Sequence, residues 1–269
     1  MRAVALLATY NEERFVGACL DHAIEQGLEV YLIDNDSTDR TVQIAERYLG
    51  RGLIGIERLR RDGMYSWRPI LERKEELAGT LSADWFLHVD ADEIRPSPRT
   101  GATLTQALAE ADRRGFDAVN FQEFTFVPTH EAPDHDHPRF YETMRRYYPF
   151  LPRHPDQVRA WKRQDVPVGL VGTAGHRVEF PGLRLYPESF PLRHYLFLSQ
   201  DHAIRKYLDR HYDPAEVAAG LHQARAALQP DDVILLPESE LRLYTSDAEL
   251  DASNPRTRHP LFARDQCRT

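Results

Sequence analysis

The sequence has little lysine, little cysteine and no excess of positive charge. Lysine occurs only at positions 74, 162 and 206, so nearly all of the positive charge is arginine, whose forked guanidinium suits phosphate. The formal net charge of −8 and the pI near 5.8 argue against broad electrostatic binding to nucleic acid or to an anionic membrane. Cysteine occurs only at positions 19 and 267, which leaves no disulfide framework and no clustered zinc motif.

Long apolar runs are also missing. No signal-peptide pattern is visible, and no apolar run approaches the roughly 20 residues that a bilayer crossing needs. At 269 residues the chain is long enough to bury a substantial core. We therefore expect a cytoplasmic protein with no integral membrane span and no nucleic-acid partner.

Apolar runs alternate with amphipathic stretches over the first half of the chain. This pattern predicts strands over residues 3–8, 30–33, 54–56 and 83–90, and helices over 11–23, 42–48 and 67–81. The order predicts an α/β fold, with a Rossmann-like, mostly parallel sheet flanked by helices. A helix over 104–113 and a strand with one polar face over 118–126 follow.

The second half is less regular. Residues 128–155 are rich in Pro, His, Asp, Arg and Tyr, and we interpret them as an ordered active-site loop rather than part of the main sheet. Shorter strands and helices are expected at 158–161, 178–180, 192–197, 200–210 and 214–228. These patterns divide the chain into a nucleotide-binding half (1–126), an acceptor-side α+β region (127–245) and a loosely held tail (246–269).

The apolar run from Ala83 to Val89 ends abruptly in the carboxylates Asp90, Asp92 and Glu93. Such a run is typical of a strand buried on both faces, and α/β proteins bind ligands where these strands end. In extended chain, residues i and i+2 point the same way, so Asp90 and Asp92 can offer two oxygen ligands to one Mg²⁺ or Mn²⁺. The alternative is an acidic turn without a metal.

Polar turns also follow the first two predicted strands. The carboxyl ends of neighbouring parallel strands meet at one sheet edge, so these turns and Asp90 are expected to line one crevice. Amide and carboxylate side chains there can pair with a base and a ribose, while a metal takes two phosphates. The residues concerned are Asn11, Glu12, Asp34, Asn35 and Asp36. Asn11 as a helix cap and Asp34 as a turn residue are the structural alternatives.

Three motifs at these strand ends resemble family 2 glycosyltransferases of the GT-A fold. They are Thr9-Tyr10-Asn11-Glu12-Glu13, the stretch from Ile33 to Thr41, and Asp90-Ala91-Asp92-Glu93. The resemblance covers the first half of the chain, with a looser likeness at 175–178 and 192–195. It implies that Tyr10, Asn11, Glu12, Asp34 and Asn35 hold the nucleoside. Many members have aspartate where this chain has Asn35, so the base stays open.

The resemblance implies transfer of a sugar from a nucleotide-diphosphate donor to an acceptor hydroxyl or amine, with inversion. Such a displacement needs a carboxylate base about 3 Å from the proton that it removes. Glu123, Asp165 and Glu179 are the candidates, with Glu123 first because it follows the metal motif on the polar side of its strand. The acceptor, whether a glycan, a lipid-linked molecule or a small molecule, stays open, as does a homodimer.

Further residues are expected to contact the metal or the phosphates. A histidine from the C-terminal half often completes a GT-A metal site, and we choose His194 against a core histidine as the alternative. His176 is a candidate for the acceptor or the phosphates. Arg68 and Arg73 are candidates for the diphosphate, against a solvated helix face that also includes Lys74.

Two other classes of protein fit paired aspartates at a strand end. A dehalogenase-like phosphatase usually has a hydroxyl residue where this chain has Ile94, and a nucleotidyltransferase usually opens with a glycine-rich basic loop instead of Ala8-Thr9-Tyr10-Asn11-Glu12. A non-catalytic sugar-nucleotide-binding protein would be expected to lose Asp90 or Asp92. We therefore favour the glycosyltransferase.

Overall fold

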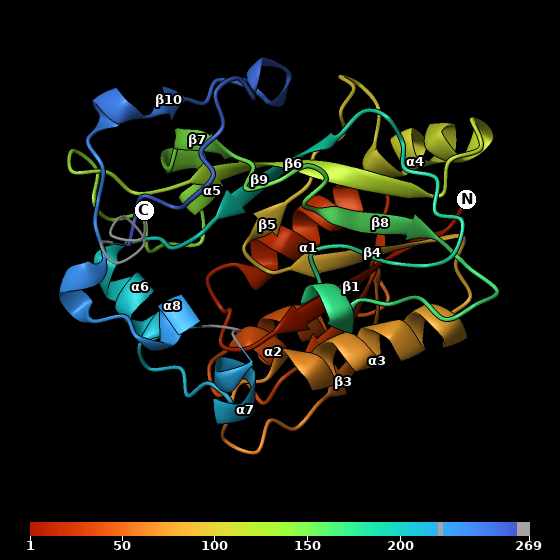
Figure 1. Cartoon of the computed structure of the whole chain (residues 1–269), viewed down its shortest axis with the longest axis horizontal. Helices are drawn as coiled ribbons and strands as arrows, with labels where there is room; N and C mark the ends of the chain where they lie inside the picture. The colour runs from red at the N-terminus through yellow and green to blue at the C-terminus, as the bar shows by residue number, and fades with distance from the viewer. Residues whose placement is uncertain (220–222, 263–269) are drawn as a thin grey trace. The chain divides into compact units, whose positions relative to one another are not determined.

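A computed structural model describes residues 1–219 and 223–262 of the chain (Figure 1). The chain contacts group into two units. The first contains residues 1–60, 67–123 and 153–193, and the second contains 61–66, 124–152 and the residues from 194 onward. In the described residues, no helix has both the length and the apolar character needed to cross a bilayer.

The first unit is built on a mixed sheet. Its strands follow the order β6-β8-β4-β1-β2-β3, with β1 parallel to both β2 and β4, and β2 parallel to β3. Strand β8 runs antiparallel to β4 and to β6. The bounds are β1 (Ala3–Thr9), β2 (Glu29–Asp34), β3 (Leu53–Arg58), β4 (Trp85–Asp90), β6 (Ala118–Phe126) and β8 (Val158–Lys162). The predicted α/β fold is confirmed; its sheet is mixed, with parallel pairing among β1 to β4 and antiparallel pairing at β8.

Helices connect these strands, as predicted. They are α1 (Val16–Glu25), α2 (Thr41–Ala45) with the 3₁₀ turn η1 (Glu46–Tyr48), α3 (Trp67–Thr80), α4 (Leu104–Arg113) and the 3₁₀ turn η2 (Val171–Thr173). Helix α4 begins at a capping box in which Thr103 and Gln106 satisfy each other's backbone N–H groups. Short β5 (Glu93–Ile94) pairs with β9 (Phe190–Tyr195), which continues into the second unit.

Helix α3 covers the face of the sheet that carries the site. Leu71 and Leu77 of α3 pack in one core cluster with Leu6 of β1 and Phe86 of β4. Because side chains alternate along a strand, His88 and Asp90 point to the same face as Phe86. The apolar pattern of β4 therefore brings its last polar side chains beneath α3.

Several sequence predictions for this unit are wrong. Asn11 does not cap a helix, because α1 begins after Phe15 and Asn11 lies in the left-handed region at φ 54°. Strand β6 is buried on both faces rather than polar on one, since its buried Asn120 and Glu123 hydrogen-bond to Gln157. Residues 178–180 hold one isolated bridge, from Glu179 to Gly169, instead of a strand.

The second unit contains more regular structure than predicted. Residues 128–155 include α5 (Phe140–Thr143) and β7 (Arg146–Phe150), which lies between β10 (Arg242–Leu243) and the C-terminal end of β6. The aromatic side chains that made this segment resemble a loop are core residues, because Tyr147 stacks on Phe126 at 5.4 Å between ring centroids and Tyr148 is buried. The remaining elements are α6 (Gln200–Tyr207), α7 (Pro214–Ala218), α8 (Gln223–Ala226) and the 3₁₀ turns η3 (Pro230–Asp232), η4 (Glu238–Glu240) and η5 (Asp247–Glu249).

The C-terminal region is packed, up to the end of the described residues. The predicted helix over 214–228 is two short helices, with residues 220–222 outside the described part. The predicted loose tail is wrong up to residue 262, because Leu261 and Phe262 are buried in the core cluster of this unit and the Asp251 N–H donates to the Tyr147 hydroxyl at 3.0 Å. Residues 263–269 lie outside the description.

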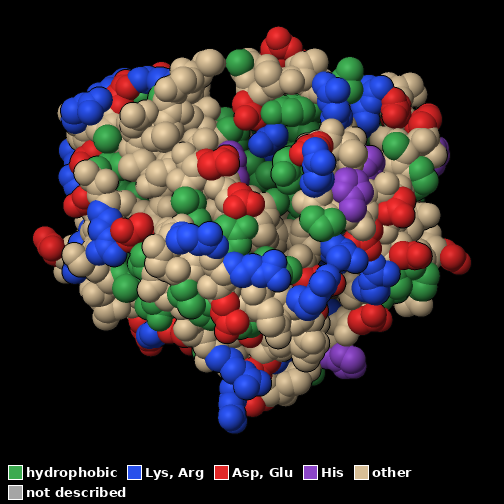
Figure 2. All heavy atoms as spheres, turned by 180° about the vertical axis from the view of Figure 1, so that it is seen from behind, with side chains coloured by type: hydrophobic (Ala, Val, Ile, Leu, Met, Phe, Trp, Pro, Cys, Tyr) green, Lys and Arg blue, Asp and Glu red, His purple; other side chains and the backbone are tan. Residues whose placement is uncertain are grey.

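Charged side chains are mixed on the surface. Figure 2 shows basic and acidic side chains interspersed across the face that it presents. Attraction of a charged ligand on this face must therefore come from local clusters.

Candidate active site at the end of strand β4

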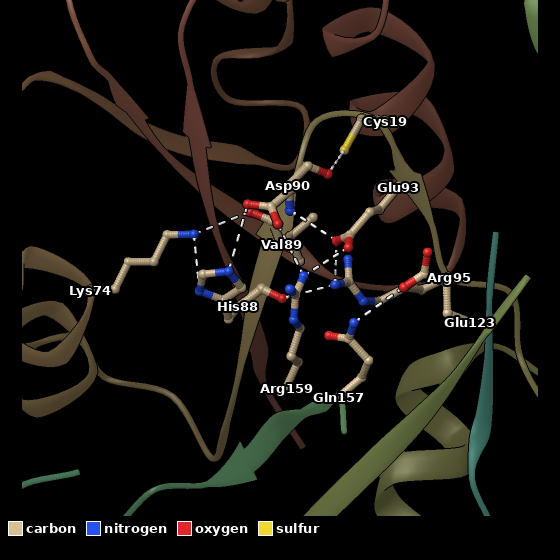
Figure 3. Close-up of polar contacts among 10 residues, drawn as sticks. All are labelled: Cys19, Lys74, His88, Val89, Asp90, Glu93, Arg95, Glu123, Gln157 and Arg159. Atoms are coloured by element: carbon tan, nitrogen blue, oxygen red, sulfur yellow. Dashed lines mark hydrogen bonds and ion pairs between the residues drawn. The ribbon is translucent and has the colours of Figure 1, made fainter. Parts of the chain in front are cut away.

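Asp90 lies at the carboxyl end of β4, with cationic and imidazole side chains around it (Figure 3). Arg159 Nη1 donates to Asp90 Oδ2 at 3.0 Å, and His88 Nε2 lies 3.6 Å from Oδ1. Although burial raises the pKa of this carboxyl, the opposing effects of His88, Arg159 and Lys74 are larger and hold it well below its usual range. The Asp90 side chain is 43% exposed, so a carboxylate that stays ionised remains accessible to a ligand.

A buried chain of alternating charges continues from Asp90. The same Arg159 Nη1 donates to Glu93 Oε1 at 2.7 Å, and Glu93 Oε2 accepts from the Asp90 N–H at 3.1 Å and from Arg95. Arg95 also donates to the His88 carbonyl at 3.0 Å. Because Glu93, Arg95 and Arg159 are buried, these charges depend on one another for solvation. This series of ion pairs fixes the turn that carries Asp90.

Lys74 approaches the other side of this site from α3. Its side chain is fully buried, and its Nζ lies 3.3 Å from His88 Nδ1 and donates to the Val89 carbonyl at 3.1 Å. Burial lowers the pKa of Lys74 to about 8 and that of His88 to about 3. The neutral imidazole therefore accepts from Lys74 at Nδ1 and turns its Nε2–H toward Asp90. The prediction of a solvated face for Lys74 is wrong.

We expect the buried Lys74 to make stability depend on pH. Its pKa is about 8 in the folded protein against an ordinary 10.5, so between these values the unfolded chain binds more protons and stability rises with pH. Compared with Lys74→Met, the wild-type protein should gain up to about 3 kcal/mol of unfolding free energy across this window. Urea denaturation at pH 7.5 and pH 10 measures the difference. Lys162→Met, at a surface lysine, is the control, and equal pH slopes in both comparisons would contradict the burial argument.

The turns after β1 and β2 are joined by hydrogen bonds. Asn11 Oδ1 accepts from the Thr38 N–H at 2.8 Å, and the Asn11 N–H donates to Ser37 Oγ at 3.0 Å. The Glu12 N–H donates to Thr41 Oγ1 at 2.8 Å. Tyr10 is half-buried beside them at the end of β1. Asn11 thus holds two turns together instead of capping a helix.

Asn35 offers a buried acceptor at this edge of the sheet. Its Nδ2 donates to the Leu59 carbonyl at 2.9 Å, which fixes the orientation of the amide, while its Oδ1 is buried with no hydrogen-bond partner among the described residues. Its neighbours have structural contacts. Asp34 Oδ2 accepts from the Ser37 N–H at 3.1 Å, and Asp36 pairs with Arg58. Asn35 is therefore the residue of this turn that is poised for a donor on a ligand.

The two predicted diphosphate arginines have protein partners. Arg73 binds Glu57 through two nitrogens at 2.8 and 2.9 Å and also pairs with Glu76 at 2.8 Å. Arg68 has a side chain that is 65% exposed and lies 3.5 Å from Glu72, one helical turn away. This geometry favours the structural alternative of a solvated helix face for both.

His176 belongs to the Asp90 neighbourhood. Burial, with the nearby Arg159 charge, lowers the pKa of His176 to about 4, and its Nδ1 is buried with no hydrogen-bond partner among the described residues. A neutral imidazole with an unused nitrogen can bind a ligand group. The prediction that His176 contacts a substrate stays a prediction.

The three base candidates occupy different places. Glu123 is buried within β6 and accepts from Gln157 Nε2 at 3.2 Å. Glu179 is 59% exposed and lies 3.6 Å from Arg177. The prediction of Asp165 as a base beside Asp90 is wrong. Strand β8 runs antiparallel to β4 and pairs Lys162 with Trp85, so the residues that follow β8 lie at the amino end of β4, whereas Asp90 lies at its carboxyl end.

The three expected metal ligands, Asp90, Asp92 and His194, lie on a strand end, in a turn and on another strand, respectively. The prediction assumed one extended strand through Asp90 and Asp92. Strand β4 ends at Asp90, and Asp92 lies in the turn that leads to β5. His194 lies on β9 at the start of the second unit. Across residues 1–219 and 223–262, no group of three His, Cys, Asp or Glu side chains is arranged as a metal cage. Carboxylates at a strand end nevertheless fit Mg²⁺ or Mn²⁺ that arrives with phosphate oxygens and water as further ligands.

Sequence reasoning missed the cations of this site. Arg159 interrupts the otherwise apolar run Val158-Arg159-Ala160-Trp161, and such an isolated charge in a buried strand indicates a buried partner. Lys74 lies on the same helical stripe as the buried Leu71 and Ala78, at spacings of three and four residues. Both signals were readable in the sequence.

Comparison with known proteins connects this edge of the sheet to a family. Residues 5–67 match the sequence model of glycosyl transferase family 2. The chain is 29% identical over 110 residues to the lipopolysaccharide core biosynthesis glycosyltransferase LpsC of Rhizobium meliloti, a match that covers 40% of this chain and 37% of LpsC. The segment that matches the family model contains the turns after β1 and β2. The N-terminal sequence of the chain is thus similar to family 2 glycosyltransferases, in agreement with the resemblance found there.

Solved structures give more distant similarities. S. aureus TarS has a TM-score of 0.45 at 14% identity, covering 86% of this chain and 45% of TarS. TarS 1–349 in complex with UDP-GlcNAc has a TM-score of 0.44 at 14% identity, covering 86% of this chain and 69% of that one. Glucosyl-3-phosphoglycerate synthase from Mycobacterium tuberculosis, in complex with Mn²⁺, UDP and phosphoglyceric acid, has a TM-score of 0.30 at 20% identity, covering 46% and 43%. The chain spans less than half of LpsC and of full TarS.

Proposed function

We propose that this protein is a metal-dependent, inverting glycosyltransferase that moves a sugar from a nucleotide-diphosphate donor to an acceptor hydroxyl or amine. One observation carries the proposal. The two turns in the family match follow β1 and β2, and Asp90 ends β4, which pairs with β1 in parallel. Their side chains therefore share the carboxyl edge of one sheet, where α/β proteins bind nucleotides.

In this proposal, Asn35 recognises the base of the donor. Its unused Oδ1 accepts a hydrogen bond from an N–H of the base, while its bond to Leu59 keeps that oxygen in place. Uracil, thymine and guanine each carry a ring N–H that meets this requirement. Tyr10, Glu12, Asp34 and Asp36 surround the nucleoside and shape its pocket.

Asp90 and Asp92 would hold Mg²⁺ or Mn²⁺, and the ion would supply positive charge to the departing diphosphate. The surrounding side chains hold the Asp90 carboxylate in position. Arg159 and Glu93 fix the Asp90 turn, and His88 keeps one side of the Asp90 carboxylate close to an N–H donor. His194 and His176 remain candidates for the third ligand and for a phosphate contact.

Glu123 is our proposed general base. It ends the part of β6 that belongs to the first unit, and its Oε2 accepts from Gln157, a contact that orients the carboxylate. A base in an inverting reaction takes one proton from the acceptor as the new bond forms. Glu179, which is exposed beside Arg177, is the alternative.

Nucleotide binding tests this function. With nucleoside diphosphate in Mn²⁺ at about 100 times its Kd, we expect about 2.7 kcal/mol of added stability, and a smaller gain at the same concentration in EDTA. Thermal unfolding with UDP, GDP, dTDP and the matching nucleotide-sugars, with and without EDTA, measures it. Product analysis separates the alternatives, since a glycosyltransferase releases nucleoside diphosphate and a nucleotidyltransferase releases pyrophosphate. Stabilisation without turnover of any donor would favour the sugar-nucleotide-binding protein.

A further inference from the structure

A second group of cations lies in the second unit, outside the Asp90 site. Its arginines and tyrosines come from the short segment between β3 and α3, from the end of α6, from the chain after it and from α8. We call this group the Arg/Tyr cluster, and it comprises Arg61, Tyr65, Tyr207, Arg210, Tyr212 and Arg225.

Backbone pairing holds the cluster together. The Tyr65 N–H donates to the His211 carbonyl at 2.6 Å, and the Asp213 N–H donates to the Tyr65 carbonyl at 2.9 Å. The rings of Tyr65 and Tyr212 meet edge to face, 5.9 Å apart. Segments far apart in the sequence are thus joined in a defined geometry, as a binding site requires.

The guanidinium groups gather on the faces of these rings. Arg210 Cζ lies 4.3 Å from the centroid of the Tyr65 ring, and Arg61 Cζ lies 6.0 Å from the same centroid. Arg225 Cζ lies 5.2 Å from the Tyr207 centroid. Cation–π contacts stabilise arginine only modestly and do not neutralise its charge. Three guanidinium groups therefore lie on the tyrosine rings of one cluster.

Arg225 is the member that most needs a ligand. In the described part of the chain, the structure gives its guanidinium the Tyr207 ring as a contact but no ion pair and no hydrogen bond. The groups that act most strongly on its charge are three tyrosines and the like-charged Arg210, with no carboxylate among them. A half-buried guanidinium beside another cation calls for an anion.

We infer that the Arg/Tyr cluster binds a phosphoryl group that carries at least two negative charges. Guanidinium groups bind phosphate oxygens through paired, charge-assisted hydrogen bonds, and several arginines match a multiply charged anion better than a single carboxylate. Two sources share this chemistry, namely the diphosphate of a nucleotide donor and a phosphate on the acceptor. The inference concerns binding and stands whether or not the protein transfers sugars.

Calorimetric titration with inorganic pyrophosphate, in EDTA, tests the site directly. We expect Arg225→Gln to weaken pyrophosphate binding by about tenfold or more, and Arg225→Lys, which keeps the charge but loses the fork, to weaken it less. Arg205→Gln is the matched control, because Arg205 lies on α6, is 56% exposed and pairs with Asp136 outside the cluster. Equal pyrophosphate affinity in Arg225→Gln and Arg205→Gln would overturn the inference.

Two further titrations identify the source, in the wild type and in Arg225→Gln. Competition between UDP and pyrophosphate, with a matching loss of UDP affinity in Arg225→Gln, supports the donor diphosphate. Binding of glycerol 3-phosphate that persists at saturating UDP and is lost in Arg225→Gln supports an acceptor phosphate. Because Asp90 lies outside the cluster, pyrophosphate binding in EDTA should survive in Asp90→Asn. Its loss there would place the anion at the Asp90 site and overturn the inference.

Discussion

Replacing Arg159 with alanine is expected to lower the free energy of unfolding by about 3 kcal/mol. The side chain is 7% exposed and neutralises both Asp90 and the deeply buried Glu93. Removing one partner from a buried ion pair costs about 3–5 kcal/mol, because the remaining charge is left without solvation. We expect the lower end of this range, since Arg95 remains beside Glu93 and Asp90 is partly exposed.

Urea denaturation followed by tryptophan fluorescence measures this loss. Lys162→Ala is the matched control, because Lys162 lies on the same strand, is 45% exposed and pairs with Asp112 at the surface. Its loss should cost less than about 1 kcal/mol. A single variant as stable as Lys162→Ala would show that the buried chain of charges does not stabilise the fold.

Replacing Asp92 with asparagine is expected to weaken metal-dependent binding of nucleoside diphosphate by about 100-fold or more. The amide is almost isosteric but carries no charge, so it cannot neutralise a divalent ion. Because Asp92 lies in the turn after β4 and not within it, we expect the folded structure to be retained. Calorimetry with the donor diphosphate in Mn²⁺, repeated in EDTA, measures the effect.

Asp165→Asn is the control for Asp92→Asn. It makes the same chemical change in an exposed loop beyond Lys162, near the amino end of β4. Binding in this control should match the parent protein in both Mn²⁺ and EDTA. If Asp92→Asn also binds like the parent in Mn²⁺, then Asp92 is not a metal ligand and the metal proposal must rest on other residues.

The parallel part of the fold was predictable because its signals are local. Strands β1, β2 and β4 are short apolar runs, each followed by polar turn residues, and α3 repeats apolar residues such as Leu71 and Leu77 at helical spacing. Strands β6, β8 and β9 were also expected close to their observed positions, whereas β7 was missed. Strand β7 consists of three aromatic residues, one arginine and one proline. Its assignment depends on the stacking of Tyr147 on Phe126, a residue 21 positions earlier, which no local pattern encodes.

From the sequence we identified the candidate site only at its acidic positions. Asp90 follows an apolar strand and was readable from that contrast alone. The partners of Asp90 come from 16 residues earlier, at Lys74, and from 69 residues later, at Arg159. Arg159 approaches Asp90, and Asp165 does not, because β8 lies beside β4 and runs antiparallel to it. That information arises from the pairing of distant segments.

The contacts of Asn11 have a consequence for the exchange of parts between relatives. The Asn11 amide oxygen completes the turn after β2 through the Thr38 N–H, and the Ser37 hydroxyl completes the turn after β1 through the Asn11 N–H. Neither turn is a self-sufficient module. A chimaera that inherits Thr9–Glu13 from one enzyme and Ile33–Thr41 from another would lose these reciprocal bonds, so transplanting nucleotide preference should require moving both segments together.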